Sequence, residues 1–301
     1  MNKRYPDFLV VGAARSGTTA LHRLLKQHPQ LFLPAVKEPC FFTFADDATE
    51  YRGGRFAFAV KEEAAYLQLF SGAGDDQCAG EISTPYLYMH SRTIAAIKRY
   101  VPHSEKVKII MVLRHPVERT FSNYLWRKRD GREDENFENA LAMEQERIRK
   151  GYSFDYFYAS RSLYSEGVKA YQDAFENVKV FLYDDFRLRQ AEVLREICDF
   201  LQVNPNFRFR KVVEINRSTS PKFPLINRWL TAELKWKFRF LNVLPTDFRD
   251  GLRNMLFKWN SSSDPEITMK QETRMSLLKK FEEDTDRLAQ LISRDLSHWK
   301  V

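Results

Sequence analysis

Cysteine is scarce in this sequence. The 301 residues include three cysteines, Cys40, Cys78 and Cys198, which are odd in number and lie far apart. Such usage excludes a disulfide framework, and the wide spacing excludes a zinc knuckle. The three thiols are therefore expected to be buried and reduced.

Long apolar runs are lacking as well. No stretch is apolar over the length that a bilayer-spanning helix needs. The first residues enter a predicted strand directly, without the charged and apolar regions of a signal peptide. The sequence therefore predicts a cytoplasmic protein without a transmembrane segment.

The net charge is positive. Lys and Arg number 48 against 40 Asp and Glu, which gives +8 at pH 7. A hydrophobic fraction of 44%, with 24 Phe, indicates a globular chain with a full core. Positive charge favours anionic partners such as nucleotides, nucleic acid, acidic glycans or a membrane surface, without choosing among them.

A strand–turn–helix pattern near the N-terminus organises the rest of the sequence. Residues 8–11 form a short continuous apolar run, as in a buried parallel strand. Gly12 ends the run, small residues follow, and apolar residues recur at helical spacing from Ala20. Such a turn aims backbone N–H groups and the positive end of a helix at one anion.

The glycine spacing is close to that of the nucleotide-triphosphate P-loop, G-x-x-x-x-G-K-[ST]. Gly12 and Gly17 are correctly separated, but Thr18 stands where that motif has its Lys. Arg15 is the only strong cation of the loop. A triphosphate would lose its β/γ-phosphate contact, whereas a single phosphate would keep a cation beside it. An ordinary strand–turn–helix without a ligand is the alternative.

The loop sequence G-A-A-R-S-G-T-T-A-L resembles the 5′-phosphosulfate loop of sulfotransferases that use 3′-phosphoadenosine 5′-phosphosulfate (PAPS). In that family a Lys or Arg at the place of Arg15 contacts the 5′-phosphate and the bridging oxygen. The resemblance implies that Arg15 is catalytic. It also implies a nucleotide-binding loop made of Ala14, Arg15, Ser16, Gly17, Thr18 and Thr19.

A second motif follows the clearest buried strand, residues 107–113. Arg114 lies at the carboxyl end of this strand, where α/β sheets bind ligands, and Ser122 lies in the helix that follows. The stretch L-R-H-P-V-E-R-T-F-S-N-Y resembles the family's 3′-phosphate motif, L-R-[DNH]-P-x-x-R-x-x-S-x-Y. The resemblance assigns the 3′-phosphate contacts to Arg114 and Ser122, with Arg119 in a supporting role.

Glu38 is the candidate general base. Pro39 keeps it on extended backbone, and Phe41 and Phe42 give it an aromatic flank. A carboxylate in an apolar setting suits general-base chemistry, but a surface pair with Lys37 explains the spacing equally well. Glycosaminoglycan and many bacterial sulfotransferases have a Glu followed closely by Phe-Phe at this place, where it deprotonates the acceptor. That resemblance implies a catalytic Glu38.

The acceptor site is expected at the end of another short strand, residues 78–82. By resemblance, Ser83 and Tyr86 line the acceptor pocket together with Lys37. Glycosaminoglycan members often have a Lys where Ser83 stands, so the sequence does not predict a second catalytic cation or a heavily sulfated acceptor. His115 competes with Glu38 as the base, because some sulfotransferases of small molecules use a His.

A polar loop at 216–222 resembles the family's late loop, N-x-S-x-x-P-[RK], which folds over the nucleotide. This resemblance gives Lys222, and less directly Arg217, a place among the phosphate-binding residues. A solvated loop without a ligand is the alternative.

Two further segments carry unusual charge. Residues 222–259 contain eight Lys or Arg against three acids, net +5, interleaved with Phe and Trp. Such a stretch can lie on an anionic membrane or cap an acceptor, and a lid packed on the domain explains it equally well. We place this lid or membrane-facing segment at 222–262. Residues 126–138 reverse charge sign within a few positions and are expected to be exposed.

These patterns predict one α/β domain over residues 1–301, with a central parallel sheet flanked by helices and a P-loop-like phosphosulfate loop. The implied activity is transfer of the sulfuryl group from PAPS, with 3′-phosphoadenosine 5′-phosphate (PAP) as product, to a hydroxyl or amine of an acceptor. A glycan or glycolipid is the first choice of acceptor, and neither a metal nor nucleic acid is expected. The alternatives are a P-loop kinase and a non-catalytic protein that binds polyanions or membranes.

Overall fold

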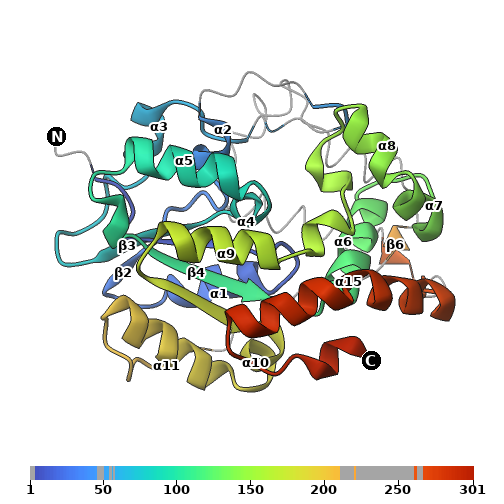
Figure 1. Cartoon of the computed structure of the whole chain (residues 1–301). Helices are drawn as coiled ribbons and strands as arrows, with labels where there is room; N and C mark the ends of the chain where they lie inside the picture. The colour runs from blue at the N-terminus through green and yellow to red at the C-terminus, as the bar shows by residue number, and fades with distance from the viewer. Residues whose placement is uncertain are drawn as a thin grey trace.

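The structure is a computed structural model that describes residues 4–45, 51–53, 56, 58–210, 220–221, 261–262 and 267–301. Its centre is a five-stranded sheet in the order β2-β3-β1-β4-β5 (Figure 1). Neighbouring strands of this sheet all pair in parallel. The strands are β1 (Phe8–Gly12), β2 (Leu31–Phe32), β3 (Cys78–Ile82), β4 (Lys108–Leu113) and β5 (Val178–Leu182).

Strand β1 is the middle strand of the sheet. All five of its residues are buried, as expected for a strand covered on both faces. Phe8 pairs with Gly80 of β3 on one side and with Lys108 of β4 on the other. A Cβ at Gly80 would lie 2.3 Å from the Phe8 ring, so only glycine lets the two strands pack at this point.

Helices cover both faces of the sheet. Alternate residues of β1 point to opposite sides, with Leu9 and Val11 in one core and Phe8 and Val10 in the other. The Leu9 face is covered by α2 (Phe41–Phe44), α3 (Glu63–Gln68), α4 (Pro85–Tyr88), α5 (His90–Tyr100), α9 (Ser165–Ala174) and α15 (Gln271–Leu291). The Phe8 face is covered by α1 (Thr18–Leu25), α10 (Tyr183–Leu188) and α11 (Gln190–Leu201).

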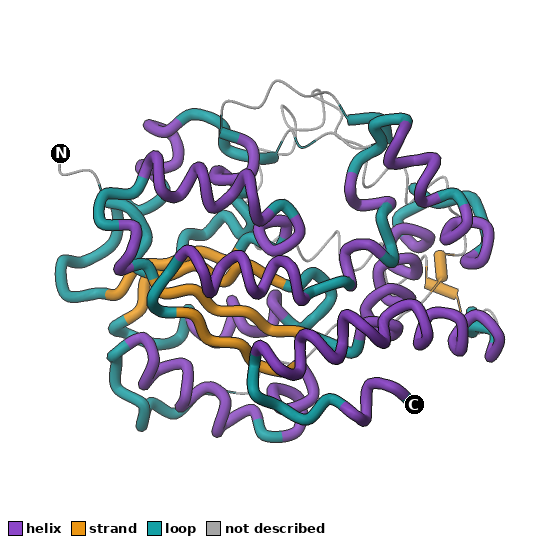
Figure 2. Tube along the Cα trace, in the orientation of Figure 1, coloured by secondary structure: helices purple, strands orange, loops and turns teal. Residues whose placement is uncertain are grey.

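A helical lobe lies beyond the carboxyl ends of the strands (Figure 2). It begins with α6 (Pro116–Arg129), which follows β4 directly and packs on α15 and α7. The other elements of the lobe are α7 (Phe137–Ala142), α8 (Glu144–Arg149) and the short 3₁₀ turns η2 (Phe154–Tyr156) and η3 (Ser160–Ser162). Two more such turns, η1 (Ser104–Lys106) and η4 (Ser297–Lys300), lie outside it.

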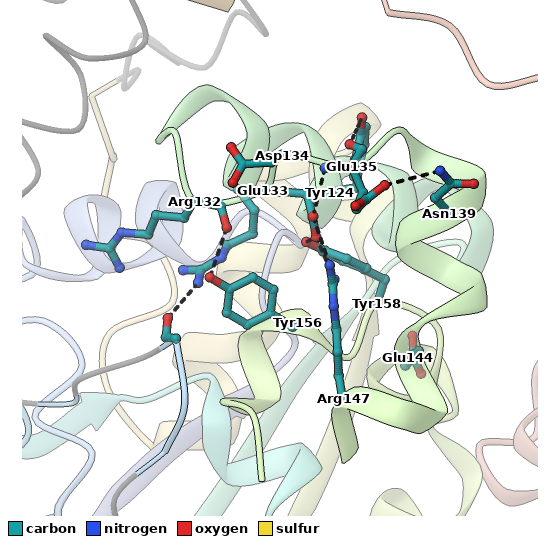
Figure 3. A network of polar contacts seen from close by, with 12 residues as sticks. Tyr124, Arg132, Glu133, Asp134, Glu135, Asn139, Glu144, Arg147, Tyr156 and Tyr158 are labelled. Carbon is teal, nitrogen blue, oxygen red and sulfur yellow. Dashed lines mark hydrogen bonds and ion pairs between the residues drawn. The ribbon is translucent and has the colours of Figure 1, made fainter. Parts of the chain in front are cut away.

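The expectation that residues 126–138 form an exposed segment is wrong. Arg127 is fully buried and Glu133 is 4% exposed. Arg147 forms two hydrogen bonds to the Glu133 carboxylate, at 2.6 and 2.9 Å, and the Tyr158 hydroxyl donates a third at 2.6 Å (Figure 3). The sign reversal in the sequence marks a buried ionic network that joins the loop after α6 to α8, and not a solvated loop.

Two short strands are described between residues 210 and 267. Strand β6 (Ser220–Pro221) pairs antiparallel with β7 (Ser261–Ser262), and β6 contacts α6. Arg217, Lys222 and the basic aromatic stretch 222–259 lie outside the described residues, so their expected roles stay predictions. None of the helices in the described part of the chain is both long and apolar enough to cross a bilayer.

The fold class predicted from the sequence is confirmed. The parallel sheet, the helices on both of its faces and the glycine turn between β1 and α1 all lie where the apolar runs indicated. Apart from residues 126–138, the differences noted lie at element ends. For example, the helix expected from residue 162 begins at Ser165, after the η3 turn.

Candidate active site

The glycine turn after β1 has the geometry of an anion cradle. Gly17 has φ +78°, and a Cβ there would lie 3.0 Å from the Tyr183 ring, so glycine is required at this position. The first hydrogen bond of α1 runs from Leu21 N–H to the Gly17 carbonyl at 3.0 Å. The N–H groups of Thr18 and Thr19 therefore have no partner within the helix and are available to an anion.

Ser16 supplies a further donor in this turn. Its side chain is fully buried, and its Oγ has no hydrogen-bond partner in the described part of the chain. A buried hydroxyl without a partner is costly, and a phosphate oxygen in the cradle would satisfy it. This orphaned hydroxyl fits the phosphate of PAPS that the sequence predicts for this loop.

The two phosphate motifs meet at Arg15. Arg15 Nε donates to Ser122 Oγ at 3.2 Å, and Arg114 Nη1 donates to the Arg15 carbonyl at 3.2 Å. These contacts form because β1 and β4 are neighbouring parallel strands whose carboxyl ends open on the same edge of the sheet. The structure thus joins the residues that the resemblance assigned to the 5′- and 3′-phosphates into one polar cluster.

Positive charge is concentrated in this cluster. The pKa of Arg15 is lowered to about 10, chiefly by burial and also by the nearby charges of Arg129 and Arg114, which Asp130 opposes in part. The Arg15 guanidinium therefore lies in a setting that disfavours its charge until an anion approaches. Such a setting suits a residue that stabilises a negatively charged ligand.

Tyr183 belongs to the site and was not singled out from the sequence. It is the first residue of α10, directly after β5, and its ring lies against Gly17. The Arg114 guanidinium carbon is 5.1 Å from the centre of the same ring. Tyr183 thus packs between the two phosphate motifs. Its place follows from β5 lying next to β4, and the strand order could not be read from the sequence.

Glu38 lies at the same edge of the sheet, beyond β3. Its N–H donates to the Ile82 carbonyl at 3.1 Å, and the Thr84 hydroxyl donates to Glu38 Oε1 at 3.3 Å. Lys37 Nζ pairs with the same carboxylate oxygen. The side chains of Glu38 and Lys37 remain 29% and 20% exposed, so an acceptor can reach them. Glu38 therefore forms the ion pair with Lys37 and also lies at the edge of the sheet where the ligand is expected.

Ser83 and Tyr86 follow β3, at the place where the sequence predicts the acceptor site. Both side chains are fully buried. Ser83 Oγ donates to Glu81 Oε2 at 2.5 Å, and the Tyr86 hydroxyl donates to Glu81 Oε1 at 2.6 Å. Their burial does not agree with a direct contact to an acceptor. The buried Glu81 was not recognised in the sequence, where it reads as an ordinary acid within a short strand.

His115 caps helix α6. Its Nδ1 accepts the Val117 N–H at 3.2 Å, and its ring lies 6.0 Å from that of Trp299. The side chain is 9% exposed, and burial lowers the pKa of His115. With one ring nitrogen committed to the helix and the other buried, His115 is poorly placed to meet an acceptor.

Arg119 is a structural residue. Its guanidinium is fully buried and donates to Ser162 Oγ and to the Tyr158 carbonyl, both at 2.6 Å. These bonds tie α6 to the η3 turn. The supporting role at the 3′-phosphate that the motif implied for Arg119 therefore does not agree with its hydrogen bonds.

Metal ligands do not converge in the described regions. No group of three or more His, Cys, Asp or Glu side chains there is arranged to hold an ion.

The chain is similar to sulfotransferases of known structure. A crystal structure of a sulfotransferase from Alicyclobacillus acidocaldarius is 31% identical, with a TM-score of 0.73, and the match covers 99% of this chain and all of that one. A mouse sulfotransferase, SULT7A1, solved with PAP bound, is 14% identical, with a TM-score of 0.53 over 96% of this chain and 88% of that one. At this identity the mouse enzyme supports the fold alone.

A curated relative agrees with these structures. The membrane-associated sulfotransferase kil1 of Dictyostelium discoideum is 30% identical over 129 residues, which make up 42% of this chain and 24% of that protein. Residues 6–206 match the model of the Sulfotransferase family. This match includes the glycine turn, Glu38 and the Arg114–Ser122 motif, and it leaves the kinase alternative without support. The chain belongs to the sulfotransferase family, whose enzymes take the sulfuryl group from PAPS and release PAP.

Proposed function

We propose that this chain transfers the sulfuryl group of PAPS to a hydroxyl of a carbohydrate or glycolipid acceptor, with Glu38 as the general base. The observation that carries the proposal is the placement of Glu38. Its carboxylate is partly exposed beyond β3, on the edge of the sheet where Arg15, Arg114 and Ser122 converge. A base on that edge can reach an acceptor that approaches the sulfuryl end of the donor.

In the proposed mechanism, Glu38 takes the proton of the acceptor hydroxyl as its oxygen forms a bond to sulfur. The bond between sulfur and the bridging oxygen breaks, and the negative charge of the leaving PAP develops beside Arg15. Arg15 and the N–H groups of Thr18 and Thr19 stabilise that charge. Lys37, paired with Glu38, holds the carboxylate close to the acceptor.

The donor would be held through both of its phosphates. The loop residues Ala14 to Thr19 and the orphaned Ser16 hydroxyl face the 5′-phosphate, and Arg114 with Ser122 binds the 3′-phosphate. Arg217 and Lys222 complete this binding from the late loop. Support for that loop comes from β6, at Ser220–Pro221, which contacts the helix that carries Ser122.

The acceptor class rests on resemblance. Glu38 is followed by Phe41 and Phe42, as in glycosaminoglycan and many bacterial sulfotransferases, whereas Ser83 stands where many glycosaminoglycan enzymes have a Lys. We therefore propose a glycan or glycolipid with few sulfate groups. We also propose a cytoplasmic protein with peripheral membrane contact through 222–259, since this stretch has net charge +5 and one relative is named as membrane-associated.

The test compares Glu38→Gln with His115→Asn at saturating PAPS, with PAP release measured over a panel of sugar, lipid-linked, alcohol, phenol and amine acceptors. Removing the proton acceptor in Glu38→Gln should lower turnover by about 10²–10⁴-fold and leave PAP affinity near that of the wild type. An active Glu38→Gln beside an inactive His115→Asn would overturn the assignment and move the acceptor class toward small alcohols or phenols.

A further inference from the structure

Glu81 is a buried carboxyl group at the end of β3. Its side chain is 1% exposed and accepts three hydrogen bonds. Tyr66 of α3 and Tyr86 of α4 donate to Oε1 at 3.0 and 2.6 Å, and Ser83 donates to Oε2 at 2.5 Å. In the described regions its hydrogen-bond partners are therefore neutral hydroxyls, and no cation compensates the buried charge by direct contact.

Two of these hydroxyls also hold the chain next to Glu38. The Cys40 N–H donates to Ser83 Oγ at 3.0 Å, and the Phe42 N–H donates to the Tyr86 hydroxyl oxygen at 3.2 Å. A hydroxyl has one proton to give. When the Glu81 carboxylate accepts the protons of Ser83 and Tyr86, the oxygen lone pairs of both hydroxyls are left for the two N–H groups.

The segment held in this way has an unfavourable backbone conformation. Glu38 has φ +60° and Cys40 has φ +55°, in the left-handed region that residues with a Cβ rarely adopt. The expectation that Pro39 keeps Glu38 on extended backbone is therefore wrong. Such a conformation persists only where neighbouring contacts impose it. The bonds from Cys40 and Phe42 to the two hydroxyls, with the bond from Glu38 N–H to Ile82, are contacts of this kind.

We propose that Glu81 is a positioning residue that fixes the orientation of Glu38 through Ser83 and Tyr86. This inference rests on the proposed role of Glu38 as the base. Glu81 is fully buried and acts on the segment through the two hydroxyls, so its effect is on the geometry of the carboxylate that meets the acceptor.

The charge of Glu81 affects how the hydroxyls around it are oriented. The pKa of Glu81 is raised to about 7, chiefly by burial and in part by the charge of Glu38, against the opposing effect of its three hydroxyl bonds. The other titratable groups that act on it from the surrounding elements are Tyr66, Tyr86, Tyr171 and Cys40, and burial keeps all four neutral by raising their pKa values. A protonated Glu81 must donate one hydrogen bond, which turns one hydroxyl away from its present arrangement.

Two tyrosines provide a matched test. Tyr86 and Tyr66 are both fully buried and both donate to Glu81 Oε1, but only Tyr86 also accepts a hydrogen bond from Phe42 N–H.

At pH 9, where Glu81 is ionised, Tyr86→Phe should lower kcat by about 10- to 100-fold. KM for PAPS should stay within twofold, and amide exchange of Phe42 should accelerate. Tyr66→Phe should leave kcat and this exchange within about twofold of the wild type. Equal effects of the two substitutions would overturn the proposal.

The pH profile gives an independent readout. Wild-type kcat should fall as the pH drops through about 7, because protonation of Glu81 loosens the segment. Glu81→Gln cannot titrate, so its kcat should be lower and should lack this limb. A limb near pH 7 that persists in Glu81→Gln would overturn the proposal, whether or not the variant is less stable.

The same set of variants separates this inference from the proposed function. Accelerated Phe42 exchange in Tyr86→Phe, together with an active Glu38→Gln, would remove Glu38 as the base and with it the positioning role of Glu81. An inactive Glu38→Gln, together with equal behaviour of Tyr86→Phe and Tyr66→Phe, would keep the base and reject Glu81 as its positioning residue.

Discussion

Three residues of the candidate site have left-handed backbone conformations although none of them is glycine. Arg15 has φ +70°, Glu38 has φ +60° and Cys40 has φ +55°. Each such residue costs roughly 1–2 kcal/mol relative to an ordinary conformation. The strain lies in the phosphate loop and in the segment of the proposed base, so these two parts of the chain are held in place at the expense of stability.

Replacing Glu38 by asparagine should reveal this strain. Asparagine adopts left-handed conformations more readily than other residues with a Cβ. Glu38→Asn should therefore be more stable than Glu38→Gln by about 1 kcal/mol, since both lose the ion pair with Lys37. The free energy of unfolding from denaturant titration measures the difference. Equal stabilities would mean that the conformation of Glu38 carries no strain.

Glu81 should make stability depend on pH. Its pKa rises from 4.5 to about 7 on folding, so the folded state binds the extra proton between these values. Stability should then fall as the pH rises from about 4.5 to 7, by about 3 kcal/mol in total. The comparison is with Glu81→Gln, measured by denaturant unfolding at several pH values. If the wild type and Glu81→Gln lost stability in parallel over this range, the pKa of Glu81 would not be raised.

Single residues were predicted best where a motif linked them to a ligand. The convergence of Arg15, Arg114 and Ser122 followed from two motifs at the ends of two buried strands. Tyr183 and Glu81 could not be found in this way. The role of Tyr183 depends on which strand lies beside β4, and that of Glu81 depends on which side of β3 faces the core.

Helix α9 begins on a cap supplied from a distant part of the chain. Asp284 of α15 accepts the Tyr164 N–H at 2.7 Å, the Ser165 N–H at 3.2 Å and the Ser165 hydroxyl at 2.5 Å. The Tyr164 hydroxyl in turn donates to the Arg114 carbonyl at 3.0 Å. The C-terminal helix thus supports the start of α9 and, through Tyr164, the backbone of a phosphate-binding residue.

Removing this cap should destabilise the whole chain. Asp284 is 6% exposed, so Asp284→Ala would leave two N–H groups and a hydroxyl buried without an acceptor. We expect a loss of about 2–3 kcal/mol in the free energy of unfolding. Asp284→Asn retains one acceptor oxygen and should lose less. An Asp284→Ala variant within 0.5 kcal/mol of the wild type would contradict the capping role.

Helices and strands could be predicted from the sequence where a single pattern, such as an apolar run, determined the structure. The short apolar runs at β1, β4 and β5 identified buried parallel strands because both faces of such strands are covered. Residues 126–138 were misjudged because charge usually indicates exposure. In this case Arg147, from another helix, compensates the buried Glu133, and a tertiary partner of this kind has no signature in the local sequence.

At the scale of the molecule, the two anion-binding motifs should discriminate between nucleotides. PAP has a 5′- and a 3′-phosphate, ATP lacks the 3′-phosphate, and AMP differs from PAP only by that group. At one hundred times its dissociation constant, PAP should stabilise the fold by about 2.7 kcal/mol. At the same concentration, ATP and AMP should raise the melting temperature much less. Equal shifts for PAP and AMP would show that Arg114 and Ser122 do not bind a phosphate.

The position of β1 in the sheet has a consequence for synthesis. β1 lies between β3 and β4, but it precedes both of them in the chain, and Phe8 pairs with Lys108. At roughly 5–20 residues per second, the ribosome needs about 5–20 s after β1 to produce its last partner. During that interval the apolar strand lacks at least one of its two neighbours and is open to association with chaperones. Substitutions that make residues 8–11 more apolar should therefore reduce the yield of folded protein before they change its activity.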